Sequence, residues 1–146
     1  MNIAKEYLKQ VETLDTKIQQ KKIELDSLKD NAIGLGAFDY SKEKVQTSAS
    51  ESLSVKVAKY VDFERELQED TTRFAELKHR VINQIHSLNN PIYMKILFKK
   101  YIEYKSLKDI ASEIKYSYDR TKHIHGVALE AFRIKILEKS TPNSTI

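Results

Sequence analysis

The sequence predicts an all-α protein in which long N-terminal coiled-coil helices precede a C-terminal helix-turn-helix bundle. Apolar side chains recur in a seven-residue pattern through most of the first ninety residues, and two short helical patterns flank a tight break between Ser106 and Phe132. The chain of 146 residues holds only three Gly and two Pro, so few positions force a helix to end. Its 32% of charged residues suits amphipathic helices with polar outer faces.

The first predicted element is a coiled-coil helix over residues 1–29. Its inward positions follow alternating steps of four and three, with Lys21 as one polar member, and comprise Tyr7, Val11, Leu14, Ile18, Lys21, Leu25 and Leu28. A polar residue in such a seam lowers stability but can fix the register and the number of partners. Residues 30–52 follow, and Gly34, Gly36 and a polar run predict a flexible linker there.

The second predicted element is a longer coiled-coil helix over residues 53–90. Its seam comprises Leu53, Val57, Tyr60, Glu64, Leu67, Thr71, Phe74, Lys78, Val81, Ile85 and Leu88. A helix of that length spans about 54 Å, which is too long for one small domain to cover, so it requires a partner helix. The first helix folded back as a hairpin and the same helix of a second copy both satisfy this requirement.

We expect a homodimer or a higher oligomer from this heptad pattern. The candidate interface residues are Val11, Leu14, Ile18, Leu25, Val57, Leu67, Phe74, Val81 and Ile85. In such an oligomer the coiled region would hold two C-terminal modules at a fixed separation.

Residues 91–139 form the predicted helix-turn-helix domain. Asn90 can cap its first helix and Pro91 can open it, and the apolar residues that follow belong in a core. Lys95, Lys99 and Lys100 are expected on the exposed rim of this helix, where they would hold the DNA backbone.

Within this domain, Ser106 and Ser117 can each cap a short helix, and Lys115 with Tyr116 forms the break between them. The inward positions predicted for the pair are Leu107, Ile110, Ala111, Ile114, Thr121, Ile124, Ala128 and Leu129. Tyr118, Asp119, Arg120, Lys122, His123 and His125 are then expected to face outward.

The outward residues of the second helix predict binding of double-stranded DNA. Arg and Lys side chains bind phosphates and guanine edges, and the first turns of a recognition helix are the turns that reach bases. The predicted DNA-binding residues are Ser117, Tyr118, Asp119, Arg120, Lys122, His123, Lys99 and Lys100. Residues 91–146 hold 11 Lys and Arg against 6 Asp and Glu, net +5, whereas residues 1–90 carry net −1. The positive charge is therefore concentrated beside the predicted recognition helix.

This stretch resembles the promoter-binding C-terminal domain of bacterial primary sigma factors, in which a Leu-x-x-Ile-Ala helix, a short turn and a Ser-capped basic helix follow one another. The matching residues are Leu107, Ile110, Ala111, Ile114, Ser117, Arg120, Lys122 and Ile124. Most of the chain is similar to small phage and prophage regulators of the ArpU and RinA type, through VAKYVDFERELQ (residues 57–68), NNPIYMKILFKKYIEYKSLKDIA (residues 89–111) and residues 125–129. The resemblance implies a role in activating transcription of late phage genes.

The sequence departs from the sigma pattern at two positions. Lys115 occupies the turn position that usually holds Gly, and a non-Gly residue with positive φ costs about 1 kcal/mol there. Thr121 occupies the early apolar anchor of the second helix and brings a hydroxyl group that requires a hydrogen-bond partner.

Other classes of function find little support in the sequence. The chain has no Cys, which removes disulfides and thiolate metal sites, and no apolar run long enough for a signal peptide or a membrane span, so we expect a cytoplasmic protein with no membrane partner. Glu76 and His79 have the spacing of a carboxylate-bridged metal site, but no second such pair exists. We expect no metal, no cofactor and no enzymatic activity.

Two alternatives to a DNA-binding regulator remain open. The chain could act as an adaptor that binds RNA polymerase or another regulator through its helices, with weak or no DNA binding. It could also be a structural coiled-coil protein, although that role does not explain the Ser-capped helix pair. The last residues, 140–146, are expected to form a disordered tail.

Overall fold

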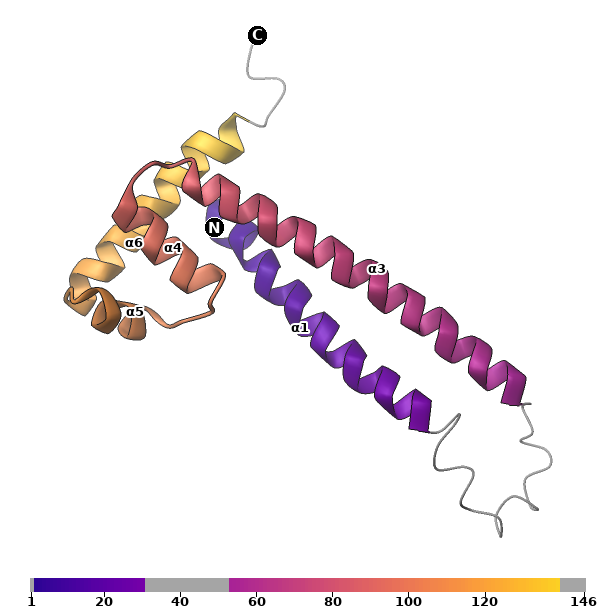
Figure 1. Cartoon of the computed structure of the whole chain (residues 1–146). Helices are drawn as coiled ribbons and strands as arrows, with labels where there is room; N and C mark the ends of the chain where they lie inside the picture. The colour runs from indigo at the N-terminus through magenta and orange to yellow at the C-terminus, as the bar shows by residue number, and fades with distance from the viewer. Residues whose placement is uncertain (1, 31–52, 140–146) are drawn as a thin grey trace. The chain divides into compact units, whose positions relative to one another are not determined.

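The computed structural model describes residues 2–30 and 53–139, all of whose regular elements are helices, so the predicted all-α class is confirmed (Figure 1). These elements are α1 (Ile3–Lys29), α3 (Leu53–His86), α4 (Pro91–Tyr101), α5 (Leu107–Ile114), α6 (Tyr118–Phe132) and a π-helical extension of α6, η4 (Arg133–Glu138). The predicted tail and nearly all of the predicted linker lie outside the described residues. Within these residues, no helix combines the length and the apolar character that a membrane span requires.

The chain divides into two compact units, one formed by Met1–Thr13 with Phe74–Ile146 and the other by Leu14–Arg73. Each of the two long helices therefore contributes to both units. The expected boundary between Asn90 and Pro91 falls inside the first unit. The reason is that the ends of α1 and α3 supply side chains to the same core as α4 and α6.

The core of the first unit is built from four helices. Its buried side chains are Ala4, Leu8, Val11, Val81, Ile85, Leu97, Tyr101, Ile102, Ala128, Leu129 and Phe132. Tyr7 lies at the edge of this core, where its hydroxyl donates to Gln84 Oε1 at 2.9 Å and its ring centroid lies 5.8 Å from that of Phe132. Burial of each large apolar side chain contributes about 1.5–3 kcal/mol, so this cluster holds α6 against the ends of α1 and α3.

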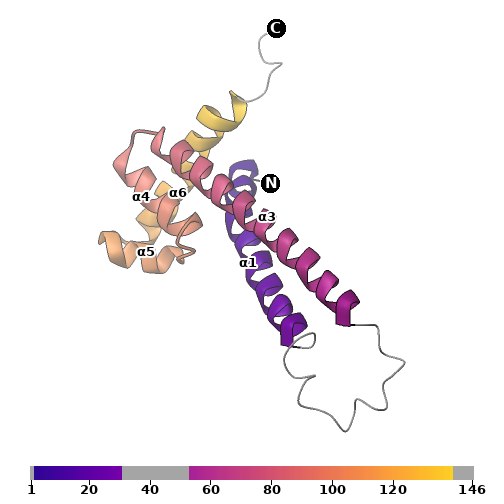
Figure 2. The same ribbon diagram turned by 45° about the vertical axis from the view of Figure 1, so that its right-hand side comes forward.

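The second unit consists of the remaining parts of α1 and α3, which lie side by side and run in opposite directions (Figures 1 and 2). Ile18 and Leu67 are buried in this unit. Lys21, the polar member of the first seam, binds Glu66 at 2.9 Å and also binds Asp70, whose side chain is almost fully covered. The hydrogen bond from Lys21 lowers the pKa of the Asp70 carboxyl, and the same bond raises the pKa of the Lys21 ammonium. Among the described residues, the partner helix of α3 is thus α1 of the same chain.

Local capping signals determine where the shorter helices begin. The Asn90 side chain accepts hydrogen bonds from the Ile92 and Tyr93 amides at 3.1 and 3.3 Å, and Pro91 is the first residue of α4. These contacts confirm the predicted cap. The helix before it, α3, ends at His86 rather than at residue 90, because the chain turns through Asn89 in the left-handed conformation, with φ of 54°.

Candidate nucleic-acid interface

The break between α5 and α6 occurs where the sequence predicts it. The Ser106 side chain accepts from the Asp109 amide at 3.1 Å at the start of α5, and the Ser117 side chain accepts from the Arg120 amide at 3.1 Å at the start of α6. Lys115 adopts the left-handed conformation, with φ of 63° and ψ of 40°, and its amide donates to the Ala111 carbonyl. A helix commonly ends this way with Gly, so Lys115 bears the cost of about 1 kcal/mol that a non-Gly residue has in this conformation.

The two helices contact each other and α4 through small and branched side chains. Ile110 and Ala111 of α5 and Ala128 and Leu129 of α6 are buried, which confirms four of the predicted inward positions. Leu107, Ile114 and Ile124 are half-buried. The methyl side chain of Ala111 allows α5 and α6 to approach closely.

Thr121 is also inward, as predicted, and its side chain is 0% exposed. Its hydroxyl oxygen has no hydrogen-bond partner among the described residues. A buried hydroxyl without a partner costs about 1–3 kcal/mol relative to a satisfied one. The partner that this hydroxyl was expected to require is therefore not found among the described residues.

The outward placement expected for His125 is wrong. His125 follows Thr121 by four residues and precedes Leu129 by four, so it lies on the buried face of α6 and is only 8% exposed. Its Nε2 lies 2.8 Å from the Tyr101 hydroxyl, and the two rings stack with centroids 5.8 Å apart. Burial, together with the smaller effect of the charges of Lys100 and Lys5, lowers the pKa of His125 to about 4. At neutral pH this imidazole is uncharged and adds no positive charge to the surface.

The outer face of the first turns of α6 carries the predicted polar residues. Tyr118, Asp119, Arg120, Lys122 and His123 are all exposed. Ser117 is exposed as well, but its hydroxyl is engaged in the cap of α6. This surface therefore combines two cations, an imidazole, a phenol and one carboxylate within a turn and a half of helix.

Aromatic rings hold the cations of this surface. The Arg120 guanidinium carbon lies 4.5 Å from the centroid of the Tyr116 ring. The ammonium groups of Lys108 and Lys122 each lie 5.9 Å from the centroid of the Tyr118 ring, one from α5 and one from α6. None of these three cations forms an ion pair with a residue that the structure describes. We call Lys108, Tyr118, Arg120 and Lys122 the cationic face.

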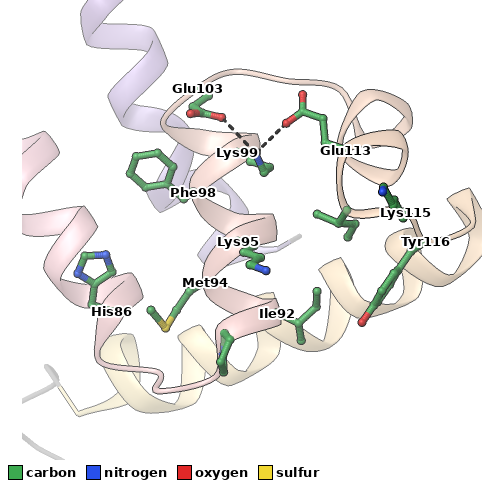
Figure 3. A pocket seen from close by; sticks show the side chains of 12 residues that line it. His86, Ile92, Met94, Lys95, Phe98, Lys99, Glu103, Glu113, Lys115 and Tyr116 are labelled. Carbon is green, nitrogen blue, oxygen red and sulfur yellow. Dashed lines mark hydrogen bonds and ion pairs between the residues drawn. The ribbon is translucent and has the colours of Figure 1, made fainter.

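The expected placement of Lys99 on an exposed rim is wrong, and its role in holding the DNA backbone stays a prediction. Lys99 is half-buried, and it binds Glu113 at 2.7 Å and lies 3.9 Å from Glu103 (Figure 3). Lys105 binds the same two carboxylates, at 2.7 Å to Glu113 and 3.3 Å to Glu103. Hydrogen bonds from both lysines lower the pKa of Glu113, with Lys105 the larger cause. This four-residue cluster ties α4 to α5, whereas Lys100 is half-buried outside the cluster.

Most of the residues predicted to form an oligomer interface are buried inside the fold of one chain. Val11, Val81 and Ile85 are fully buried in the core of the first unit, and Ile18 and Leu67 are buried in the second. Leu14, Leu25 and Phe74 are half-buried, and Val57 is 37% exposed. The buried members are core residues of the folded chain, because the hairpin supplies the partner helix that their periodicity demands.

Two residues of the candidate site, Lys108 and Tyr116, were not predicted from the sequence. Lys108 lies on the exposed side of the first turn of α5, and a helical wheel of residues 107–114 would have placed it opposite Ile110 and Ile114. Tyr116 was assigned only to the break, and its contact with Arg120 depends on the path of the turn. No periodic signal in the sequence reveals that contact.

Metal binding finds no support in this part of the protein. Across residues 2–30 and 53–139, no three His, Cys, Asp or Glu side chains are grouped so that they could hold an ion.

Comparisons of the chain with protein families, with characterised proteins and with solved structures find no match.

Proposed function

We propose that α5 and α6 form a helix-turn-helix that binds double-stranded DNA in a sequence-dependent manner, and that the protein regulates transcription. The observation that carries this proposal is the cationic face. Lys108 and Lys122 are exposed beside the Tyr118 ring, and Arg120 is exposed beside the Tyr116 ring. All three lack a carboxylate partner among the described residues. The resemblance to phage regulators supports promoters of phage genes as the targets.

The distribution of ion pairs supports an external anion as the partner of this face. The cations that join α4 to α5, Lys99 and Lys105, are neutralised by Glu103 and Glu113. The cations of the first turns of α6 are not neutralised in this way. Phosphate groups of DNA would supply the missing charge, and counterion release would supply much of the binding free energy.

The chemistry of each exposed side chain suits a distinct contact in the major groove. The planar guanidinium of Arg120 can donate two hydrogen bonds to the O6 and N7 atoms of a guanine, and Asp119 can accept from a cytosine N4 group. Lys108 and Lys122, whose ammonium groups both lie beside the Tyr118 ring, are suited to phosphate oxygens. His123 lies one turn further along α6 and can reach an adjacent base pair.

The test is a DNA-binding titration of the purified protein across a salt series, with sequencing of the fragments enriched from a random pool. Arg120→Ala should weaken the selected site about 5- to 150-fold and relax the preference at one base position. Lys122→Ala should weaken all sequences alike and reduce the slope of log K against log salt by about one. Lys22→Ala, on the exposed side of α1, removes the same charge elsewhere and serves as the control.

The outcome that excludes the proposal is equally specific. If the double variant Arg120→Ala, Lys122→Ala binds the pool as the unmodified protein does, α6 is not a recognition helix. If binding is salt-sensitive but no sequence is enriched, the cationic face binds phosphates without reading bases.

The expected oligomer is tested separately, by the mass of the protein in solution measured by light scattering.

A further inference from the structure

A groove in the first unit lies between α4 and the segment from Glu113 to Tyr116 (Figure 3). No residue of the cationic face lines it, although Tyr116, which contacts Arg120, forms part of its wall. Its volume is about 760 Å³. That volume falls within the range of about 300–1,000 Å³ that is usual for sites of small organic ligands. The proposed DNA contacts do not account for this groove, because its walls are largely apolar.

The apolar part of the groove is formed by side chains that the core leaves partly uncovered. Ile92, Met94 and Phe98 of α4 and Ile114 of α5 are all half-buried and line it. Ile92 and Ile114 are not among the side chains that pack against the core of the first unit. Their exposed surface is therefore available to an apolar body inside the groove, and covering it would be favourable.

Two cations on the groove walls form no ion pair with the part of the chain that the structure describes. Lys95 of α4 and Lys115 of the break lie on opposite sides of the groove (Figure 3), and neither forms an ion pair with any described residue. The acidic residues of the same walls, Glu103 and Glu113, are held by Lys99 and Lys105 at distances of 2.7–3.9 Å. The charge that remains unneutralised in the groove is thus positive.

We propose that this groove binds a small organic anion with an apolar body, such as an aromatic or alkyl carboxylate or sulfonate. The apolar body would lie over Ile92 and Ile114, and the acidic group would lie between the ammonium groups of Lys95 and Lys115. Apolar walls with a few converging charged groups are the usual composition of such sites. An inorganic phosphate or a DNA backbone would leave the apolar walls uncovered and is a poorer fit.

The test uses a matched pair of fluorescent probes, 8-anilinonaphthalene-1-sulfonate and its uncharged relative N-phenyl-1-naphthylamine. The sulfonate should bind the full chain at one site and should be displaced by decanoate. Lys95→Gln combined with Lys115→Gln should weaken the sulfonate about tenfold, because two charge-assisted contacts are lost, and should change binding of the uncharged probe less than about twofold. Ile92→Ala should weaken both probes, because it removes apolar contact area from the groove wall.

Matched controls separate this result from a general change in charge or folding. Lys9→Gln combined with Lys22→Gln removes two exposed cations of α1 and should leave both probes unaffected. Circular dichroism melting should show that each variant remains folded. Tighter binding of the uncharged probe than of the sulfonate, binding at several unsaturable sites, or an unchanged affinity in the Lys95, Lys115 double variant would each overturn the proposal. The assay contains no DNA, so its outcome does not depend on the function proposed for α6.

Discussion

The guanidinium carbon of Arg120 lies 4.5 Å from the centroid of the Tyr116 ring, so the side chain proposed to read a base rests on the turn that precedes its helix. A guanidinium held over an aromatic face gains about 0.5–1 kcal/mol at an exposed site. The contact also restricts the rotamers of Arg120 before any DNA is bound, which reduces the entropy lost on binding.

Tyr116 therefore acts as a positioning residue for Arg120 in the proposed complex. Tyr116→Leu should weaken binding to the selected DNA site about two- to fivefold through the lost ring contact. Tyr116→Phe retains the ring and should bind within about twofold of the unmodified protein. The measurement is fluorescence anisotropy with the enriched site at fixed salt, and equal affinities for the Leu and Phe variants would show that the ring does not hold Arg120.

Thr121 should be replaceable by Val with a gain in stability. Val has nearly the same shape, and the substitution removes a buried hydroxyl whose oxygen has no partner among the described residues. We expect the free energy of unfolding to rise by about 0.5–1.5 kcal/mol, measured by urea denaturation. Thr72→Val, on an exposed turn of α3, is the matched control and should change stability by less than about 0.5 kcal/mol. A loss of stability in Thr121→Val would mean that the hydroxyl is satisfied in solution.

His125 should make stability depend on pH below neutrality. Its folded-state pKa is lowered to about 4 from an ordinary 6.5, so the unfolded chain binds more protons than the folded one between these values. The stabilisation is fully present above pH 6.5 and is lost as the pH falls toward 4. We expect a decrease of about 2 kcal/mol between pH 7.5 and pH 5 from this residue.

The measurement is urea denaturation at both pH values, compared with a variant that cannot titrate. His125→Gln should flatten the pH dependence, because Gln carries no charge at either pH. His123→Gln, on the exposed side of the same helix, should retain the dependence of the unmodified protein. An equal slope in His125→Gln and the unmodified protein would show that the groups responsible lie elsewhere.

Lys21 should stabilise the hairpin formed by α1 and α3. It binds Glu66 and Asp70, and the Asp70 side chain is only 9% exposed. Lys21→Met should lower the free energy of unfolding by about 1–3 kcal/mol, because it leaves this carboxylate with Arg73 as its remaining cation. Lys22→Met, at the neighbouring exposed position, should change the free energy of unfolding little. Thermal denaturation of both variants is the measurement.

A double variant distinguishes the ion pair from simple packing at this position. Lys21→Met combined with Asp70→Leu replaces both charges by apolar groups and should recover most of the stability lost in Lys21→Met. If the double variant is less stable than either single variant, the two side chains do not act as a pair.

The sequence by itself determined the features that depend on residues a few positions apart. Asn90, Ser106 and Ser117 cap helices because their side chains reach amides two or three residues ahead. The inward positions Ile110, Ala111, Ala128 and Leu129 follow from the helical period alone. His125 obeys the same period, since it lies four residues after Thr121, so the helical period also predicts its burial.

The tertiary structure decided which charges are free and which helix pairs with which. Lys99 meets Glu113 across fourteen residues of chain, and His125 meets Tyr101 across twenty-four, so neither contact has a signature in local spacing. A heptad pattern requires a partner helix but does not say whether it belongs to the same chain. The ion pairs of Lys21 with Glu66 and Asp70 answer that question for the described residues. Each of these outcomes depends on where the chain reverses direction, which periodicity and capping do not specify.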